Sequence, residues 1–110
     1  MGTKQTINVA KDFSTEPYGR YPTDGEDSGA RFRDEWLLPS LQKFDVVRVE
    51  LDGTEGYMSS FLDEAFGGLV RLQHFSKEKL LAKLTFISEE DPSLVSEIAG
   101  YINCAKPGSK

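Results

Sequence analysis

Residues 45–75 constrain the fold more than any other part of the chain, because they combine the patterns of a strand, a turn and a helix. In residues 46–51 the aliphatic side chains recur at every second position, and this period of two is typical of a strand with one buried face. After a polar turn, Ser59 and Ser60 precede an apolar stripe that predicts an amphipathic helix from Ser60 to about residue 75. A serine at such a helix start can cap free amides or carry a phosphate, so the question of function centres on these two hydroxyls.

The sequence before this segment predicts two further elements. Residues 7–9 are expected to form a short first strand, and a helix is expected to begin at Ser28, because serine is a preferred capping residue. Pro39 should kink or end that helix, since proline lacks the amide hydrogen that a helix needs. The stretch 11–29 is polar and rich in glycine and proline, and a second short strand is possible near residues 18–21.

After residue 75 the sequence predicts a strand over residues 81–87 and a last helix that starts at Asp91 and Pro92. Strand, helix and strand in succession imply a parallel pair. Because the second face of the 46–51 strand carries charges, we expect the helices mainly on one face of the sheet. The prediction is therefore an α/β fold with a mixed sheet of about four strands. Its expected core is Val47, Val49, Leu51, Leu62, Phe66, Leu69, Leu84 and Phe86.

Length and charge set the outer bounds. With 110 residues, of which 38% are hydrophobic and 28% charged, the chain is expected to form a single domain over residues 1–110, with a flexible tail at 106–110. A net charge of -5 argues against binding to nucleic acids or to an anionic membrane surface. No apolar run is long enough to span a membrane, and no signal peptide is visible. A single cysteine, Cys104, fits a reducing compartment, so we expect a cytoplasmic protein.

The sequence offers little for catalysis. His74, the only histidine, lies on the same predicted helix as Ser60, about 21 Å along its axis at 1.5 Å per residue, so it cannot activate that hydroxyl. No phosphate-binding loop, dinucleotide fingerprint or nucleophile elbow is present. The acidic pair Asp63 and Glu64 lacks histidine or cysteine ligands nearby, and early acids complement a helix dipole. We therefore expect no enzyme activity, no cofactor and no metal.

The run SSFLDEAFGG, the LDG before it, and the upstream pieces Gly19-Arg20 and SGARFRDEWLLPSL resemble the STAS-like domain family, which is related to the anti-sigma-factor antagonists. The resemblance covers roughly residues 7–102. Antagonists of this kind carry a serine at the start of a helix that an ATP-dependent partner kinase phosphorylates, and Ser60 matches that serine, with Ser59 as its neighbour. The resemblance thus implies a bacterial signalling module, with a protein partner that resembles a histidine-kinase-like ATPase.

Three hypotheses about function follow. In the first, phosphorylation of Ser60 or Ser59 switches the affinity for a protein partner, whose docked surface would meet Asp63 and Glu64. In the second, the chain is a constitutive interaction domain, and Ser60 only caps the helix, with Asp63 completing a capping box. In the third, the helix start binds a small anion or a nucleotide. That anion site would use Arg20, Arg31 or Arg33.

The pair Gly67 and Gly68 also needs an explanation, because each glycine inside a helix costs about 1 kcal/mol relative to alanine. We interpret the pair as a place where another helix approaches closely, either from the same domain or from a partner. The oligomeric state stays open.

Overall fold

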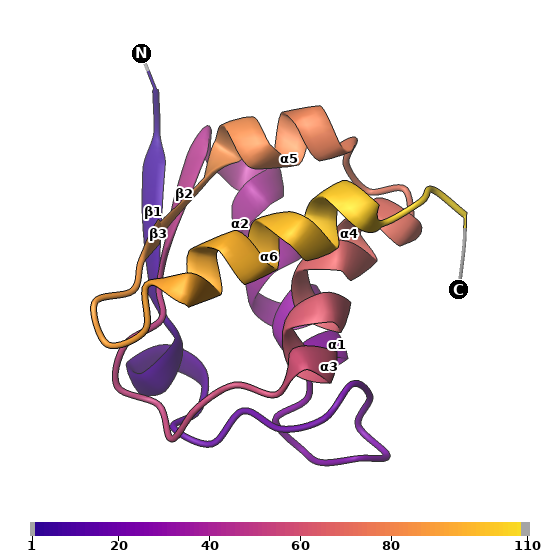
Figure 1. Cartoon of the computed structure of the whole chain (residues 1–110). Helices are drawn as coiled ribbons and strands as arrows, with labels where there is room; N and C mark the ends of the chain where they lie inside the picture. The colour runs from indigo at the N-terminus through magenta and orange to yellow at the C-terminus, as the bar shows by residue number, and fades with distance from the viewer. Residues whose placement is uncertain (1, 109–110) are drawn as a thin grey trace.

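Three parallel strands form the sheet of the computed structural model, which describes residues 2–108 (Figure 1). The strands are β1 (Lys4–Asn8), β2 (Val46–Glu50) and β3 (Leu84–Ile87), side by side in the order β1-β2-β3. Both strand pairs are parallel, so the prediction of a mixed sheet is wrong. No fourth strand occurs in residues 2–108, and the segment near residue 20 is an irregular loop.

Two long helices, each with a wider π-helical turn in its middle, provide most of the remaining structure. We call residues 29–43 the first long helix and residues 59–71 the second long helix. The first consists of α1 (Gly29–Phe32), η2 (Arg33–Leu37) and α2 (Leu38–Lys43), and the second of α3 (Ser59–Leu62), η3 (Asp63–Gly67) and α4 (Gly68–Arg71). The other helical elements are η1 (Val9–Phe13), α5 (Lys77–Lys83) and α6 (Ser93–Cys104).

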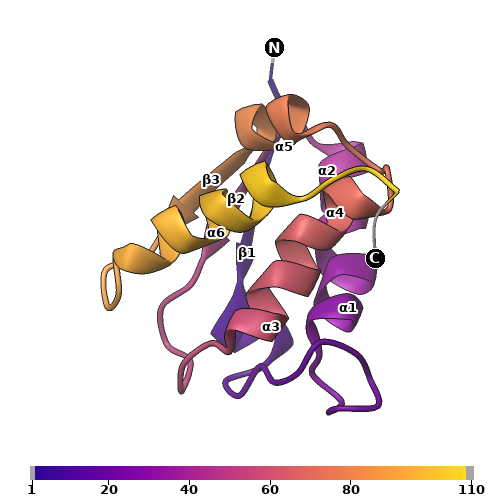
Figure 2. The same ribbon diagram turned by 45° about the vertical axis from the view of Figure 1, so that its right-hand side comes forward.

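All the helices α1–α6 lie on the same face of the sheet (Figures 1 and 2), as the charged second face of β2 predicted. Consecutive parallel strands require a crossover between them, and here each crossover is helical. The uncovered face carries Thr6, Arg48 and Thr85 in register across the three strands. Polar side chains there keep contact with water, which the covered face does not allow.

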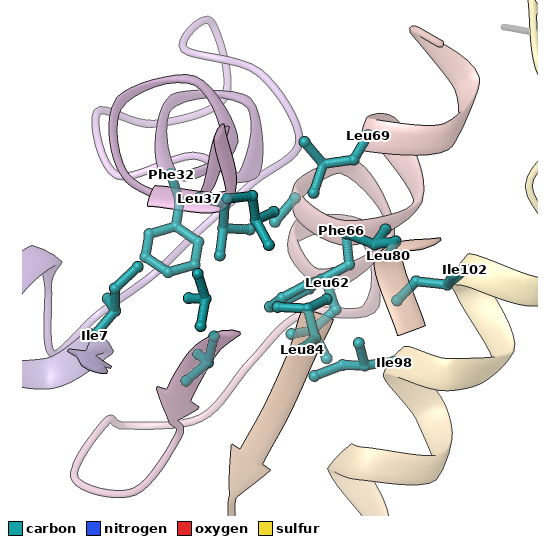
Figure 3. Packing of buried hydrophobic residues seen from close by; sticks show 14 of the residues in the cluster. Ile7, Phe32, Leu37, Leu62, Phe66, Leu69, Leu80, Leu84, Ile98 and Ile102 are labelled. Atoms are coloured by element: carbon teal, nitrogen blue, oxygen red, sulfur yellow. The ribbon is translucent and has the colours of Figure 1, made fainter. Parts of the chain in front are cut away.

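The core lies between the covered face and the two long helices (Figure 3). Of the predicted core residues, all are buried except Phe86, which is partly buried against the others. The rings of Phe32, Phe61 and Phe13 pack together, with centroid distances of 5.9 Å between Phe32 and Phe61 and 5.0 Å between Phe13 and Phe32. Phe32 and Phe61 are fully buried, which contributes about 1.5–3 kcal/mol for each, and the cluster therefore holds η1 and the starts of the two long helices together.

Two local predictions need correction. Of the two outcomes predicted for Pro39, the end of the helix is wrong, because a π-helical turn over Arg33–Leu37 lies just before the proline and the helix continues to Lys43. A kink at this position stays a prediction. Residues 81–87 are not one strand. Helix α5 occupies residues 77–83, and its start is capped by Ser76, whose hydroxyl accepts a hydrogen bond from the Lys79 amide at 3.2 Å.

The predicted flexible tail lies partly outside the described residues, since residues 109–110 are not among them. Within the described part, the amide of Gly108 donates to the carbonyl of Arg71 at 2.8 Å. That hydrogen bond holds the chain beyond α6 against the end of the second long helix, while the flexibility of the tail stays a prediction.

Candidate functional site

Ser59 and Ser60 are the first two residues of the second long helix, so the helix starts one residue earlier than predicted. The capping position is Met58, and no side chain there accepts a hydrogen bond from the first turn. The hypothesis that Ser60 caps the helix is therefore wrong, because a capping residue stands outside the helical backbone and Ser60 stands inside it. Ser59 is exposed and Ser60 is half-buried.

The two hydroxyls have different surroundings. Ser59 lies near the hydroxyl of Tyr101 on α6, and that hydroxyl donates to the carboxylate of Glu97 at 2.6 Å. The hydrogen bond to Glu97 is the main reason that the pKa of Tyr101 is raised from 10.0 to about 12. Ser59 thus lies against a negatively charged part of α6.

Ser60 instead lines a shallow hollow of about 410 Å³ between the helix start and the loop before α1. Large side chains with exposed apolar surface surround it: Tyr18 is 55% exposed, Tyr21 49% and Met58 41%. Arg20 contributes a positive charge to this hollow and Asp24 a negative one. None of the three exposed apolar residues was predicted from the sequence, although two tyrosines within an otherwise polar loop were a usable signal.

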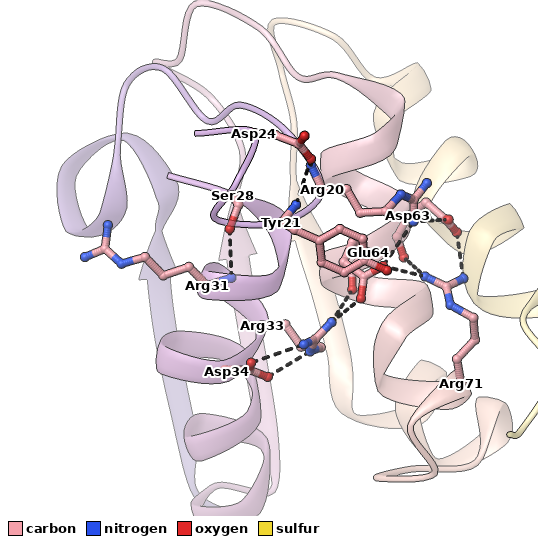
Figure 4. A network of polar contacts seen from close by, with 10 residues as sticks. All are labelled: Arg20, Tyr21, Asp24, Ser28, Arg31, Arg33, Asp34, Asp63, Glu64 and Arg71. Atoms are coloured by element: carbon pink, nitrogen blue, oxygen red, sulfur yellow. Dashed lines mark hydrogen bonds and ion pairs between the residues drawn. The ribbon is translucent and has the colours of Figure 1, made fainter. Parts of the chain in front are cut away.

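Beneath the hollow lies a network of ion pairs, which we call the arginine–carboxylate cluster (Figure 4). Arg20 from the loop reaches Asp63 and Glu64 of η3, with Nη1 at 2.8 Å from Asp63 Oδ2 and 3.1 Å from Glu64 Oε1. Arg71 of α4 meets the same two carboxylates at 3.0 Å and 3.3 Å. Arg33 of η2 pairs with the other oxygen of Glu64. Each carboxylate therefore has at least two arginine partners.

Burial differs across the cluster. The side chains of Arg33 and Glu64 are both 7% exposed, whereas Arg20 is 32% exposed and Asp63 25%. Burial acts to lower the pKa of Arg20, but its hydrogen bonds to Asp63 and Glu64 outweigh that effect and raise the pKa above its ordinary value. The deep part of the cluster thus joins the two long helices, and only its outer part, Arg20 with Asp63, reaches the surface.

The glycine pair, Gly67 and Gly68, leaves the space that side chains of the arginine–carboxylate cluster occupy. A Cβ on Gly68 would lie 2.8 Å from Arg33 Nη1, and one on Gly67 would lie 2.9 Å from Asp63 Oδ1 and 3.3 Å from the carbonyl oxygen of Tyr101. Both glycines are buried inside the domain, with α6 and the first long helix as their neighbours. Their bare backbone makes room for arginine and carboxylate side chains, which the sequence alone did not reveal.

A closer approach to a neighbouring helix backbone occurs at another glycine, Gly29. A Cβ there would lie 2.4 Å from the carbonyl oxygen of Phe61, so α1 and α3 meet at van der Waals contact of their main chains. Ser28 caps the first long helix as predicted, with its hydroxyl accepting from the Arg31 amide at 3.2 Å.

The arginines of the predicted anion site do not converge on Ser60. Arg31 binds Asp27 and Glu35 at 2.8 Å and 3.2 Å and lies over the ring of Phe13, so it faces a different side of α1. Arg33 is buried in the cluster, and Arg20 alone lines the hollow. The structure therefore brings one guanidinium to Ser60, already engaged by two carboxylates.

Residues 2–108 contain no cluster of three or more histidine, cysteine or acidic side chains arranged to hold a metal ion. Within the same residues, no helix has the length and apolar character needed to cross a membrane.

Comparison with known proteins gives one result. A family model described as a STAS-like domain of unknown function (DUF4325) matches residues 28–94, from the cap of the first long helix to the start of α6, and includes both serines and both carboxylates of η3. A search of the curated proteins found no match. A search of the solved structures found none either. A STAS-like domain suggests a regulatory module that acts through protein interaction. Because the matched residues make up more than half of the chain, the protein belongs to this family of STAS-like domains.

Proposed function

We propose that this chain is a regulatory protein-interaction module whose partner docks on the hollow around Ser60, and that phosphorylation of Ser60 by an ATP-binding partner kinase switches the affinity. The observation that supports this proposal best is the position of Ser60 among Tyr18, Tyr21 and Met58. Exposed apolar side chains gathered around a hollow are typical of interaction surfaces. The chain acts in this proposal by binding and not by catalysis.

Electrostatics favours Ser60 over Ser59 as the modified residue. A phosphate on Ser59 would meet the carboxylate of Glu97, which already holds the Tyr101 hydroxyl at 2.6 Å. A phosphate on Ser60 would share its hollow with Arg20, and with Asp24, whose carboxylate already accepts hydrogen bonds from the amides of Arg20 and Tyr21. Since a phosphate carries about -1.5 to -2 charges, the guanidinium supports it and the carboxylate of Glu97 opposes it.

The fold should tolerate that phosphate. Negative charge in the first turn complements the helix dipole. Arg20 can turn from the cluster toward the phosphate, because Asp63 and Glu64 keep their ion pairs with Arg71 at 3.0 Å and 3.3 Å. The phosphate should instead weaken binding of the partner, because a charged group would fill the hollow where the partner's apolar side chain docks. An apolar contact cannot replace the hydration of a phosphate.

The test is recovery of bound proteins from the native cell with wild type, Ser60→Ala and Ser60→Asp as baits. We expect Ser60→Ala to retain the partner and Ser60→Asp to lose most of it. Ser96→Asp, an exposed position on α6, adds the same charge elsewhere and should bind normally. Circular dichroism of each variant checks folding, and mass spectrometry of the protein from native cells checks for phosphate on Ser59 or Ser60.

The outcomes of these experiments distinguish the three hypotheses about function. Equal recovery of the partner by all baits, with no phosphate on either serine, would support a constitutive interaction domain. Phosphate on Ser59 alone would reject the electrostatic argument for Ser60. Thermal shift with inorganic phosphate and nucleotides tests the small-anion hypothesis, for which the single guanidinium of Arg20 is the weakest point.

A further inference from the structure

We infer that the hollow around Ser60 is one end of a longer groove, and that the groove binds a peptide segment with one large apolar side chain at one end and lysine or arginine toward the other. This inference rests on the proposed function, because it names the chemical class of the partner that docks there.

The groove consists of three hollows that share walls. Tyr18 and Met58 line both the hollow at Ser60 and a second hollow of about 410 Å³. The second hollow shares Glu55, Gly56 and Tyr57 with a third one of about 270 Å³, which extends to α6. The hollows therefore follow one path along the loop between β2 and α3.

The walls of this groove are held together by hydrogen bonds. The amide of Glu55 donates to the carbonyl of Thr15 at 2.7 Å, which joins the loop after β2 to the loop after η1. The hydroxyl of Tyr57 donates to the carbonyl of Leu51 at 2.8 Å. A groove fixed in this way needs little ordering when a peptide binds, which favours affinity.

An apolar anchor fits the end of the groove at Ser60. Met58 is unbranched and flexible, and such side chains adapt to apolar partners of different shape. Tyr18 and Tyr21 offer large, rigid rings with about half of their surface exposed. In most interfaces a few residues carry most of the binding energy. Here that role falls to one apolar side chain of the partner, buried among these three residues.

Charge complementarity identifies the rest of the segment. Glu16 and Glu55 line the second hollow, and the third adds four carboxylates. Those of the third hollow are Asp52, Glu90, Asp91 and Glu97. Among the described residues no lysine, arginine or histidine lines these two hollows, so no cationic side chain balances the carboxylates in their walls. A basic segment is attracted to this part of the groove, and an acidic one is repelled.

The two ends give the bound segment an orientation. Its apolar side chain lies near Ser60, and its basic side chains lie beyond Glu55 toward α6. A phosphate on Ser60 would therefore act on the apolar end of the segment. The attraction between that phosphate and the basic side chains at the other end of the segment is weakened by salt, since the screening length is about 8 Å at physiological ionic strength.

The experiment measures binding of a short fluorescent peptide, with one phenylalanine at one end and lysines toward the other, to the unmodified full chain by fluorescence anisotropy. Two matched peptides replace either the phenylalanine by serine or the lysines by glutamates. We expect about tenfold weaker binding without the phenylalanine and no measurable binding with glutamates. The affinity should fall steeply as salt rises.

Variants locate the site. Met58→Ser should weaken binding several-fold, whereas Leu81→Ser, which removes an exposed apolar side chain on α5, should not. The pair Glu16→Gln and Glu55→Gln should weaken binding by about three- to tenfold at low salt. The control pair Glu26→Gln and Glu78→Gln removes the same charge from exposed positions outside the groove and should have little effect.

Equal binding of the lysine and glutamate peptides, or equal losses in the groove and control variants, would overturn the inference. Because the peptide is measured on a chain without phosphate, this result does not depend on modification of Ser60. The proposed switch can then fail, with Ser60→Asp leaving partner recovery unchanged, while the groove still selects a basic segment. In the converse case, Ser60→Asp abolishes partner recovery while the lysine and glutamate peptides bind equally. That result would support the switch at Ser60 and reject a basic partner segment.

Discussion

Arg33 and Glu64 form a buried ion pair that joins the two long helices, and both side chains are 7% exposed. The guanidinium reaches Glu64 across Gly68, whose missing side chain leaves the space that the arginine occupies. The same guanidinium holds Asp34 with its other nitrogens, at 2.8 Å and 3.1 Å. Buried charges are stable only when they are paired, so each partner depends on the other.

We expect removal of one partner to destabilise the fold severely. Glu64→Gln leaves the buried Arg33 with only Asp34 as its carboxylate partner, and Arg33→Met leaves Glu64 with only Arg20 and Arg71. Breaking a buried ion pair typically costs about 3–5 kcal/mol of unfolding free energy, and the remaining partners make this the upper limit of the expected loss. The double variant Arg33→Met with Glu64→Leu removes both charges and should recover much of that loss, because well-packed apolar residues can replace a buried pair. Urea unfolding measures all three.

Arg31→Gln is the matched control for this pair. Arg31 is 39% exposed and binds Asp27 and Glu35 at the surface, where an ion pair contributes about 0–1 kcal/mol. Similar losses for Arg33→Met and Arg31→Gln would show that the buried cluster has no special weight in stability.

Three glycines should respond differently to alanine. Gly29→Ala would place a methyl group 2.4 Å from the carbonyl oxygen of Phe61, a backbone atom that cannot move aside, so we expect a loss of about 1–3 kcal/mol or more. Gly68→Ala meets the guanidinium of Arg33, which is held in the buried ion pair but belongs to a side chain and can shift more easily than backbone, so it should cost less. Gly100→Ala on α6 has open space around it and should stabilise the fold by up to about 1 kcal/mol. Thermal unfolding of the three variants should follow this order, and a stabilising Gly29→Ala would contradict the close approach of α1 and α3.

These residues also show which parts of the fold local sequence patterns can predict. The strand β2 was predicted because Val47 and Val49 alternate with charged residues, a signal contained within a few positions. The apolar stripe with Leu62 and Phe66 was predicted for the same reason, at the period of a helix. Helix α5 was missed because it is short and its leucines lie only a few positions before those of β3, and so short an apolar segment does not separate helix from strand by period.

The candidate site was predicted only in part. The start of the second long helix is a local feature, so Ser59 and Ser60 were found. The cluster around Glu64 joins residues 31 and 44 positions apart, as the contacts of Arg33 and Arg20 show, and no period in the sequence encodes such pairings. The exposure of Met58 likewise depends on where a distant loop packs.

Two tyrosines, Tyr57 and Tyr101, should lose their hydroxyl protons only at a pH well above the ordinary tyrosine pKa. Burial raises the pKa of Tyr57 from 10.0 to about 12, and the hydrogen bond to Glu97 raises that of Tyr101 to about 12. In both cases the folded state keeps its proton to a higher pH than the unfolded state, so the stabilising contribution is complete below pH 10 and is lost as the pH rises toward about 12. Stability should therefore fall across that window.

Tyrosinate absorbance during a pH titration measures this directly. Tyr57→Phe and Tyr101→Phe should each remove one late-titrating group, and Glu97→Gln should move the pKa of Tyr101 back toward 10 while leaving Tyr57 late. If Glu97→Gln leaves the whole titration unchanged, the carboxylate does not control Tyr101.

Asp52, which lines the third hollow of the groove, should hold two loops together at that end of the sheet. Its carboxylate oxygens accept hydrogen bonds from the amides of Glu89 and Glu90 at 3.0 Å and 2.9 Å, and the side chain of Glu90 in turn accepts from the amide of Gly53 at 2.8 Å. These bonds link the loop after β2 to the loop after β3. Hydrogen bonds to a charged group contribute about 1.5–3 kcal/mol, and the lower end applies to these exposed ones. Asp52→Ala should therefore destabilise the fold by about 1–2 kcal/mol and accelerate hydrogen exchange of both amides, whereas Asp52→Asn, which keeps one acceptor oxygen, should do so less. Unchanged exchange at both amides in Asp52→Ala would show that the two loops are held by something other than this carboxylate.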